Sequence, residues 1–281
     1  MIAIIAVIAV GATGAFFSDT ETSTGNTFAA GEIDLRVDNE SYYNSQPSPK
    51  TSWTLADLTI EKFFDFSDVK PGDDGEDTIS LHVTNNDSWL CADVKLTSDN
   101  DNTCNEPEGS DEMLDVNGKI ISPTPGCSTQ GELADNIEFM WWADDGDNVF
   151  EADETTLAGT GGTLGALSVG QSASVTLADA TNNVWDSNGG PVPGDGSTRY
   201  IAKAWCFGDI GEAPLSQDGE VEDWSPATDN DGVTGVDERD GGFTCSGASS
   251  SNNVTQTDSF TADISFRAEQ SRNNLDFVCN Q

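Results

Sequence analysis

The sequence predicts an all-β protein with a jelly-roll-like antiparallel β-sandwich, and three observations support this. Apolar and polar residues alternate with a period of two, which is typical of half-buried strands, most clearly over residues 259–270. The apolar positions of this run are Phe260, Ala262, Ile264, Phe266 and Ala268. Segments rich in Gly, Asp, Asn, Ser and Pro separate such runs. No long amphipathic helix is visible, and only residues 52–64 fit a short one.

The remaining strands are predicted in chain order from the same alternation. Five runs have one apolar and one polar side, as expected for strands with one solvated face. They are residues 32–37, 77–85, 92–98, 136–142 and 172–179. A sixth run, residues 199–207, is apolar enough to be covered on both faces. Pro71 and Gly72 suit the central positions of a type II turn, because proline presets φ and glycine accepts positive φ.

The N-terminus has the pattern of a secretory signal peptide. An uncharged apolar run from Ile2 to Val10 leads into small residues and then into an acidic, hydroxylated stretch. Such a run is too short to cross a hydrocarbon core of about 30 Å. Cleavage after Ala15 is expected, because Thr13 and Ala15 place small residues where a signal peptidase reads them. We therefore expect a secreted protein, with no stable membrane insertion after processing.

This processing divides the chain into three parts. They are a signal peptide (1–15), an N-terminal segment (16–31) and a β-sandwich domain (32–281). The domain is long enough to bury a substantial core.

The amino-acid composition is strongly acidic. Fifty Asp and Glu residues stand against 11 Lys and Arg residues, so the formal net charge is -39. Such a surface repels nucleic acid and anionic lipid, and both are excluded as partners. Divalent cations or a salty environment fit the charge better. The one histidine, His82, lies in a strand-like run and is expected to be structural.

Six cysteines in an exported chain predict three disulfides. No C-x-x-C pair is present, so a zinc site is poorly supported. Order along the chain favours three pairs: Cys104 with Cys127, Cys206 with Cys245, and Cys91 with Cys279. The acidic segments 99–131 and 208–253 are then predicted as long loop insertions pinned by disulfides.

Two acidic loops are candidate calcium sites, because they gather hard oxygen ligands in turn-forming sequence. The stronger candidate comprises Asp145, Asp147, Asn148, Glu151, Asp153 and Glu154. The weaker one comprises Asp229, Asp231, Asp237 and Asp240. Neither has the ligand spacing of an EF-hand loop, and exposed acidic turns without any ion are the alternative interpretation.

Two blocks of sequence resemble the TasA and camelysin family of secreted, fibre-forming biofilm-matrix proteins and their archaeal bundling-pilus relatives. Residues 11–37 contain a small-residue cleavage site running into Phe and Asp, followed by T-F-A-A-G-E-I-D-L. Residues 65–87 contain V-K-P-G-D and V-T-N-N around a predicted turn. The acidic insertions and the cysteines depart from the short, cysteine-free members, so only the general β-sandwich carries over beyond this region.

The resemblance implies a filament subunit that is cut by a dedicated signal peptidase and then polymerises with itself, head to tail. In such filaments the freed N-terminus inserts into the next subunit as a missing strand. Strand addition of this kind gains affinity from main-chain hydrogen bonds and register from side-chain pockets. The donor residues would be Phe16, Phe17, Ser18, Asp19, Thr20, Glu21 and Thr22, within the proline-free segment 16–25.

Two other functions compete with that of a filament subunit. Camelysin has been described as a protease, but this chain has neither H-E-x-x-H nor G-x-S-x-G, and we do not expect an enzyme. The second is a monomeric cell-surface adhesin or carbohydrate-binding module, for which the seven tryptophans, notably Trp141 and Trp142, would offer stacking platforms. These two residues point to opposite faces of one strand, so at least one is expected in the core.

Overall fold

The computed structural model describes residues 32–103, 131–216, 241–247 and 253–280. Several predicted features therefore lie outside the described residues. They are the signal peptide (1–15), the donor segment (16–31), the Cys104–Cys127 pair, and the second calcium candidate, Asp229, Asp231, Asp237 and Asp240.

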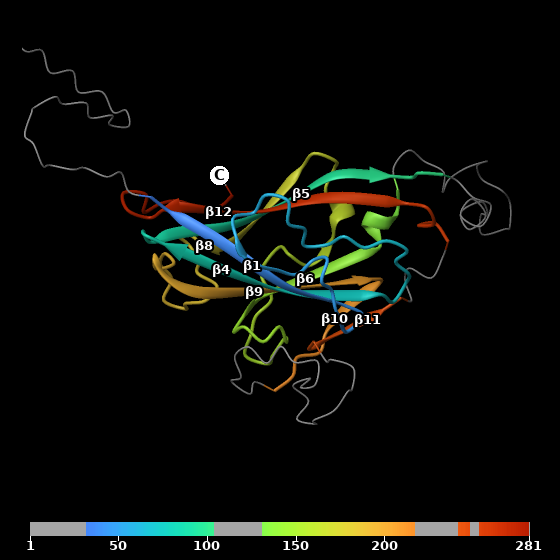
Figure 1. Ribbon diagram of the computed structural model, residues 1–281, viewed down its shortest axis with the longest axis horizontal. Coiled ribbons are helices and arrows are strands. Elements are labelled where there is room, and N and C mark those ends of the chain that lie inside the picture. The colour runs from blue at the N-terminus through green and yellow to red at the C-terminus, as the bar shows by residue number, and fades with distance from the viewer. Residues whose placement is uncertain (1–31, 104–130, 217–240, 248–252, 281) are drawn as a thin grey trace, which may run out of the picture. The chain divides into compact units, whose positions relative to one another are not determined.

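The described chain is an antiparallel β-sandwich, as the sequence predicts (Figure 1). The larger sheet contains β1 (Asp34–Tyr43), β2 (Gln46–Pro47), β3 (Trp53–Ala56), β4 (Asp74–Thr84), β6 (Ile137–Asp144), β7 (Gly162–Thr163) and β9 (Asp195–Phe207). Its order is β2-β1-β4-β9-β6-β7, with β3 also paired to β1. The second sheet has the order β12-β5-β8, formed by β12 (Ser259–Gln270), β5 (Ser88–Asn100) and β8 (Ser172–Ala178).

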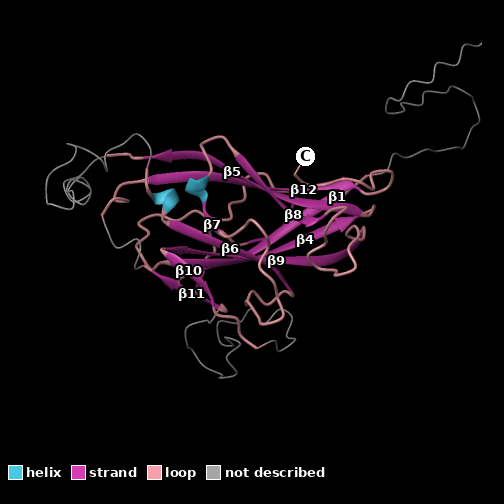
Figure 2. Cartoon of the chain, turned by 180° about the vertical axis from the view of Figure 1, so that it is seen from behind, coloured by secondary structure: helices cyan, strands magenta, loops and turns pink. Residues whose placement is uncertain are grey.

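From β4 onward, the longer strands alternate between the two layers. β4, β6 and β9 belong to the larger sheet, and β5, β8 and β12 belong to the smaller one. In Figure 1, β12 and β5 run along the top of the view while β9 and β6 lie below them. The described helical structure is limited to two 3₁₀ turns, η1 (Leu133–Asp135) and η2 (Leu164–Ala166), visible in Figure 2.

The core lies between the two sheets and is made of the predicted alternating residues. Ile79, Leu81 and Val83 share the inner face of β4 and are fully buried. Leu90 and Leu96 of β5 meet them from the other sheet, also fully buried. Burying such a side chain contributes roughly 1.5 to 3 kcal/mol. The predicted strand at residues 199–207 is buried from Ile201 to Phe207, which confirms that both of its faces are covered.

The short helix expected over residues 52–64 is wrong. Trp53 to Ala56 form β3, which pairs with β1, and no regular structure follows up to Val69. The Trp53 ring packs edge-on against Phe63, with the ring centroids 4.9 Å apart. Tertiary packing of these aromatic side chains therefore overrides a weak helical pattern.

The segment 208–253 is not wholly a loop insertion. It contributes β10 (Asp209–Glu212) and β11 (Phe243–Ser246), which pair with each other as a small separate sheet. The Cys206–Cys245 disulfide joins β11 to the end of β9, so this pair of cysteines is as predicted. β5 likewise extends to Asn100, two residues into the other predicted insertion.

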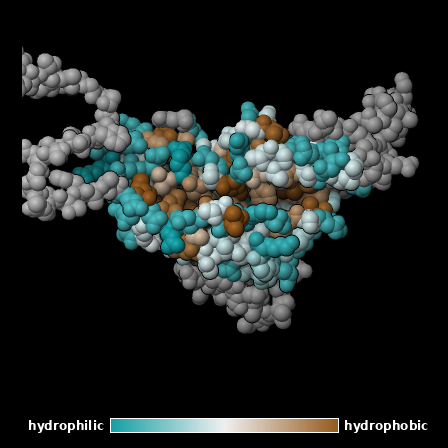
Figure 3. Space-filling model, turned by 45° about the horizontal axis from the view of Figure 1, so that its top comes forward, coloured by the Kyte–Doolittle hydropathy of each residue, from teal (hydrophilic) through white to brown (hydrophobic). Residues whose placement is uncertain are grey.

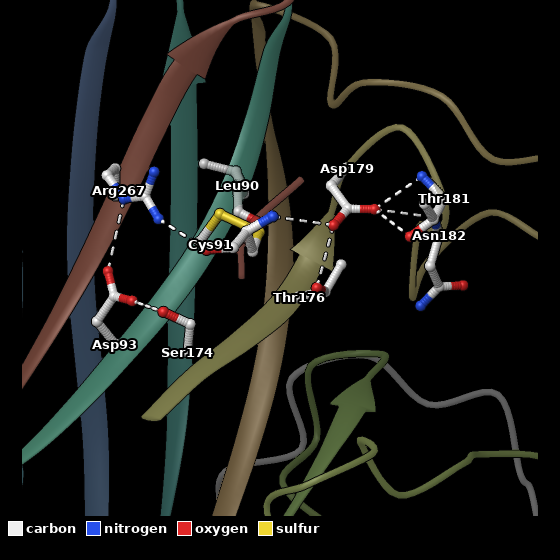
Figure 4. The surroundings of a disulfide bond; sticks show 10 residues. Leu90, Cys91, Asp93, Ser174, Thr176, Asp179, Thr181, Asn182 and Arg267 are labelled. Carbon is white, nitrogen blue, oxygen red and sulfur yellow. Dashed lines mark hydrogen bonds and ion pairs between the residues drawn. A yellow bond between two sulfur atoms is a disulfide. The ribbon is translucent and has the colours of Figure 1, made fainter. Parts of the chain in front are cut away.

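The disulfide Cys91–Cys279 is also as predicted, and it ties the C-terminal segment to the middle strand of the smaller sheet (Figure 4). The Asp179 carboxylate accepts the backbone N–H of Cys279 at 3.1 Å and that of Thr181 at 2.8 Å. Arg267 donates to the carbonyl oxygen of Cys279 at 3.3 Å. The end of the chain is thus held by one covalent bond and by polar contacts from β12 and from the turn that follows β8.

Candidate metal centre and the open edge of the sandwich

The loop that follows β6 is organised by Asp144. Its carboxylate accepts the backbone N–H groups of Gly146 at 3.0 Å and Asn148 at 3.2 Å, and the indole N–H of Trp142 at 3.0 Å. Gly146 and Asn148 have φ values of 120° and 61°, a region that glycine and asparagine tolerate best. The sequence D-D-G-D-N therefore folds into a tight loop around one buried carboxylate.

This loop brings three acidic side chains together. Asp145, Asp147 and Glu151 each offer a carboxylate oxygen, and these oxygens lie within 4.8 Å of one another. Asp147 and Glu151 are buried, with 2% and 0% of their surface exposed, while Asp145 is half-buried. Carboxylate oxygens in this arrangement are suited to a hard divalent cation. The triad can therefore bind a metal ion.

Burial and mutual repulsion make the charged form of this cluster costly. Burial, opposed by hydrogen bonds from Asn148 and Trp142, raises the pKa of Asp144 to about 7. Burial and the charges of Asp144 and Asp145 raise the pKa of Asp147 to about 8. A bound cation would reverse this penalty, because it would attract the same carboxylates.

The other three predicted ligands, Glu154, Asn148 and Asp153, are not members of this triad. Glu154 accepts the backbone N–H of Glu151 at 3.0 Å, and burial together with the charge of Asp144 raises its pKa to about 9. Asn148 is fully buried within the loop, whereas Asp153 is exposed. The sequence interpretation missed Asp144, which the D-x-G-x-N spacing of an Asx-type turn would have indicated.

The loop is fixed in place by two segments that are distant in sequence. Phe150 donates its backbone N–H to the carbonyl of Gly241 at 2.9 Å, and Leu215 donates to the carbonyl of Phe150 at 3.0 Å. The Phe150 ring packs against Trp142 with centroids 5.5 Å apart. The triad is therefore held by a packed frame, which limits how far its ligands can move apart.

A second feature is the edge of the smaller sheet. Across the described residues, β12 pairs with β5 on one side and with no strand on the other. Its inward apolar residues, including Phe260, Ile264 and Phe266, are only half-buried, in contrast to the fully buried ones of β5. A long edge strand with partly exposed apolar side chains is a site for pairing with another chain.

The irregular segment 57–69 packs beside β12 without pairing with it. Phe63 meets Phe266 and Phe64 meets Phe260, with ring centroids 5.9 and 6.1 Å apart. Among the described residues, segment 57–69 forms no backbone-to-backbone hydrogen bond with any strand. The main-chain groups along the outer edge of β12 are therefore left to other partners.

An apolar cavity of about 260 Å³ lies between the sheets near the start of β12. Its lining includes Phe66, Leu133, Phe139, Trp205 and Phe260. Figure 3 shows a band of apolar surface between polar margins on the face in view. The sandwich thus offers both unpaired backbone and apolar space on the same side.

Comparison with known proteins adds no assignment. No protein-family model matches the chain, and no curated protein matches its sequence. No helix within the described ranges is both long and apolar enough to span a membrane.

Proposed function

We propose that this chain is a secreted structural subunit of an extracellular filament, which polymerises when the processed N-terminus of one copy adds a strand to the next. The observation that carries the proposal is β12, a 12-residue edge strand whose outer side has no partner among the described residues. Two disulfides support export, because such bonds persist in oxidising compartments. The resemblance of residues 11–87 to fibre-forming proteins supports the same function.

The acceptor on the sandwich would be β12 with its adjacent apolar cavity. An added strand would satisfy the outer backbone groups of β12, and its alternate side chains would cover the half-exposed Phe260 and Phe266. Phe16 and Phe17 of the neighbouring copy would supply the anchors, each contributing roughly 1.5 to 3 kcal/mol by area. Because each copy donates at one end and accepts elsewhere, the contact does not close and produces a filament.

We further propose that the metal of the acidic triad is calcium. Asp145, Asp147 and Glu151 supply only hard oxygen ligands on a loop, and calcium accepts six to eight such ligands in flexible geometry. Asp147 and Glu151 are buried, so an ion there would be shielded from water. Its role would be structural, because it would hold together a loop whose carboxylates otherwise repel one another.

The filament proposal is tested by deleting residues 16–25 from the exported chain, with the signal peptide and cleavage site retained. We expect a folded protein that forms no filaments under negative-stain microscopy. Phe17→Asp should weaken polymerisation more than the matched Thr22→Ala, because only the former removes an apolar anchor. Filaments of normal length from the deletion variant would overturn strand donation by this segment.

The adhesin or carbohydrate-binding alternative relied most on Trp141 and Trp142, and neither of these two rings is available as a platform. Trp141 lies in the core between the sheets with 3% of its surface exposed. Trp142 is fully buried on the opposite face of β6, in a smaller cluster with Phe150. Neither ring can stack on a sugar without unfolding its surroundings.

A further inference from the structure

The interior of the sandwich contains one ion pair whose surroundings are unusual. Lys203 on β9 and Asp77 on β4 are directly opposite each other in the register of the larger sheet. Both side chains point inward with the core residues Ile79, Ile201 and Trp205, and both are fully buried. Lysine and aspartate are rarely buried to this extent unless they interact with each other.

The two charged groups are in closer contact than an ordinary ion pair. Lys203 Nζ is 2.5 Å from Asp77 Oδ2, whereas charge-assisted hydrogen bonds between nitrogen and oxygen span about 2.7 to 2.9 Å. The amine nitrogen is therefore in direct contact with the carboxyl group.

The other carboxyl oxygen has a fixed donor. Asn39 Nδ2 on β1 donates to Asp77 Oδ1 at 2.9 Å, and it also donates to the carbonyl oxygen of Thr51 at 2.6 Å. The ring of Phe64 covers the amine, with its centroid 5.8 Å from Lys203 Nζ. A polarised carboxyl group, an amine in contact with it and an apolar cover are the conditions that favour acyl transfer.

Burial also changes which product is stable. In water, hydration of the separate ammonium and carboxylate favours the ionised pair over the amide. Inside the sandwich that hydration is lost, so the charged pair carries a desolvation penalty that a neutral amide does not. Consistent with this, burial raises the pKa of Asp77 despite the opposing effects of Lys203 and Asn39.

We propose that Lys203 and Asp77 condense into an intramolecular amide that cross-links β9 to β4. The bond forms between Lys203 Nζ and Asp77 Cγ, and the bond between Cγ and Oδ2 breaks. The ammonium gives up two protons to the departing oxygen, which leaves as water, so no other reactant is needed. Asn39 Nδ2 stabilises the negative charge that develops on Oδ1. This cross-link does not depend on the filament function proposed above.

The test is peptide mapping of the full exported chain by mass spectrometry, after reduction and alkylation. Trypsin cannot cut after an acylated lysine. We therefore expect a branched peptide in which residues 63–95 are joined to residues 200–239, lighter than the sum of the two by one water molecule. Fragmentation should locate the bond at Asp77 and Lys203. Linear peptides cut after Lys203 would overturn the proposal, as would a bond to Asn39 with loss of ammonia.

Two variants control the assignment. Lys203→Met keeps a long buried side chain but has no amine, and it should abolish the branched peptide. Lys50→Met, which changes an exposed lysine outside both peptides, should leave the branched peptide at its full amount. A branched peptide that survived in the Lys203→Met chain would contradict the assignment. The mapping of the unaltered chain stands even if that variant fails to fold.

Discussion

The acidic loop around Asp144 shows which properties of single residues the sequence predicts and which depend on the fold. The cluster of oxygen ligands after residue 144 was predictable, because six acidic or amide residues fall within one short loop. The burial of Asp144 and Asp147 was not, because it depends on neighbours far along the chain. Asp144 is opposite Tyr200 of β9, and Phe150 is bound to Gly241 and Leu215. Local sequence identified the candidate ligands, and only tertiary pairing determines which of them meet.

Calcium should stabilise the folded protein through the acidic triad. An ion that binds only the native state raises stability by about 2.7 kcal/mol when its concentration is 100 times the dissociation constant. We expect a higher melting temperature in millimolar calcium than in chelator, and no such difference when Asp145 and Asp147 are both changed to Ala.

Asp153→Ala is the matched control for this prediction, because Asp153 is exposed in the same loop. Its calcium response should equal that of the unaltered chain. A shift that sodium reproduces at equal ionic strength would mean charge screening instead of a specific site.

The raised pKa values of Asp147 and Glu154 predict how stability without metal depends on pH. Their folded pKa values, about 8 and about 9, exceed the ordinary values of 3.8 and 4.5. The folded state then binds protons more tightly than the unfolded state, so stability falls as the pH rises through 8 and 9. In chelator, urea denaturation should give a lower free energy of unfolding at about pH 9 than at about pH 6.

Calcium should suppress most of that pH dependence, because the cation replaces the protons on the same carboxylates. An equal loss of stability in calcium and in chelator would indicate that groups elsewhere in the molecule are responsible.

At the scale of elements, the long strands were predictable and the short ones were not. Runs such as residues 77–85 and 259–270 carry enough alternating positions to define a strand by themselves. β10 and β11 have only four residues each, within Gly- and Asp-rich sequence, and they pair across a long stretch of chain. β3 forms because Trp53 packs on Phe63 and the backbone of β3 pairs with β1. No local sequence pattern predicts these two contacts.

Removing the Cys91–Cys279 disulfide tests how the C-terminal segment stabilises the smaller sheet. Changing both cysteines to Ala should lower the free energy of unfolding by about 2 to 5 kcal/mol, since the bond closes a long loop. Urea denaturation of the double variant measures this. A loss below about 0.5 kcal/mol, the usual limit for surface substitutions, would show that the polar contacts of Asp179 and Arg267 suffice.

At the scale of the whole molecule, strong negative charge and an open sheet edge act in opposite directions. A net charge of -39 keeps separate copies apart at low salt, whereas the outer edge of β12 favours their association. Strand addition is compatible with this repulsion between copies, because main-chain hydrogen bonds and buried phenylalanines attract at short range and only at one defined site. We therefore expect filament assembly to increase with salt concentration, as screening weakens the repulsion between copies.

The most direct test of the central claim is a high-resolution electron cryo-microscopy map of filaments assembled from the processed chain. The account predicts that residues 16–25 of one copy run as a strand along the outer edge of β12 in the next copy. Because adjacent side chains of a strand point to opposite faces, Phe17 should lie on the side of that edge that carries Phe260 and Phe266, and Phe16 on the other side. A map in which β12 has no intermolecular partner, with copies joined through other surfaces, would contradict it.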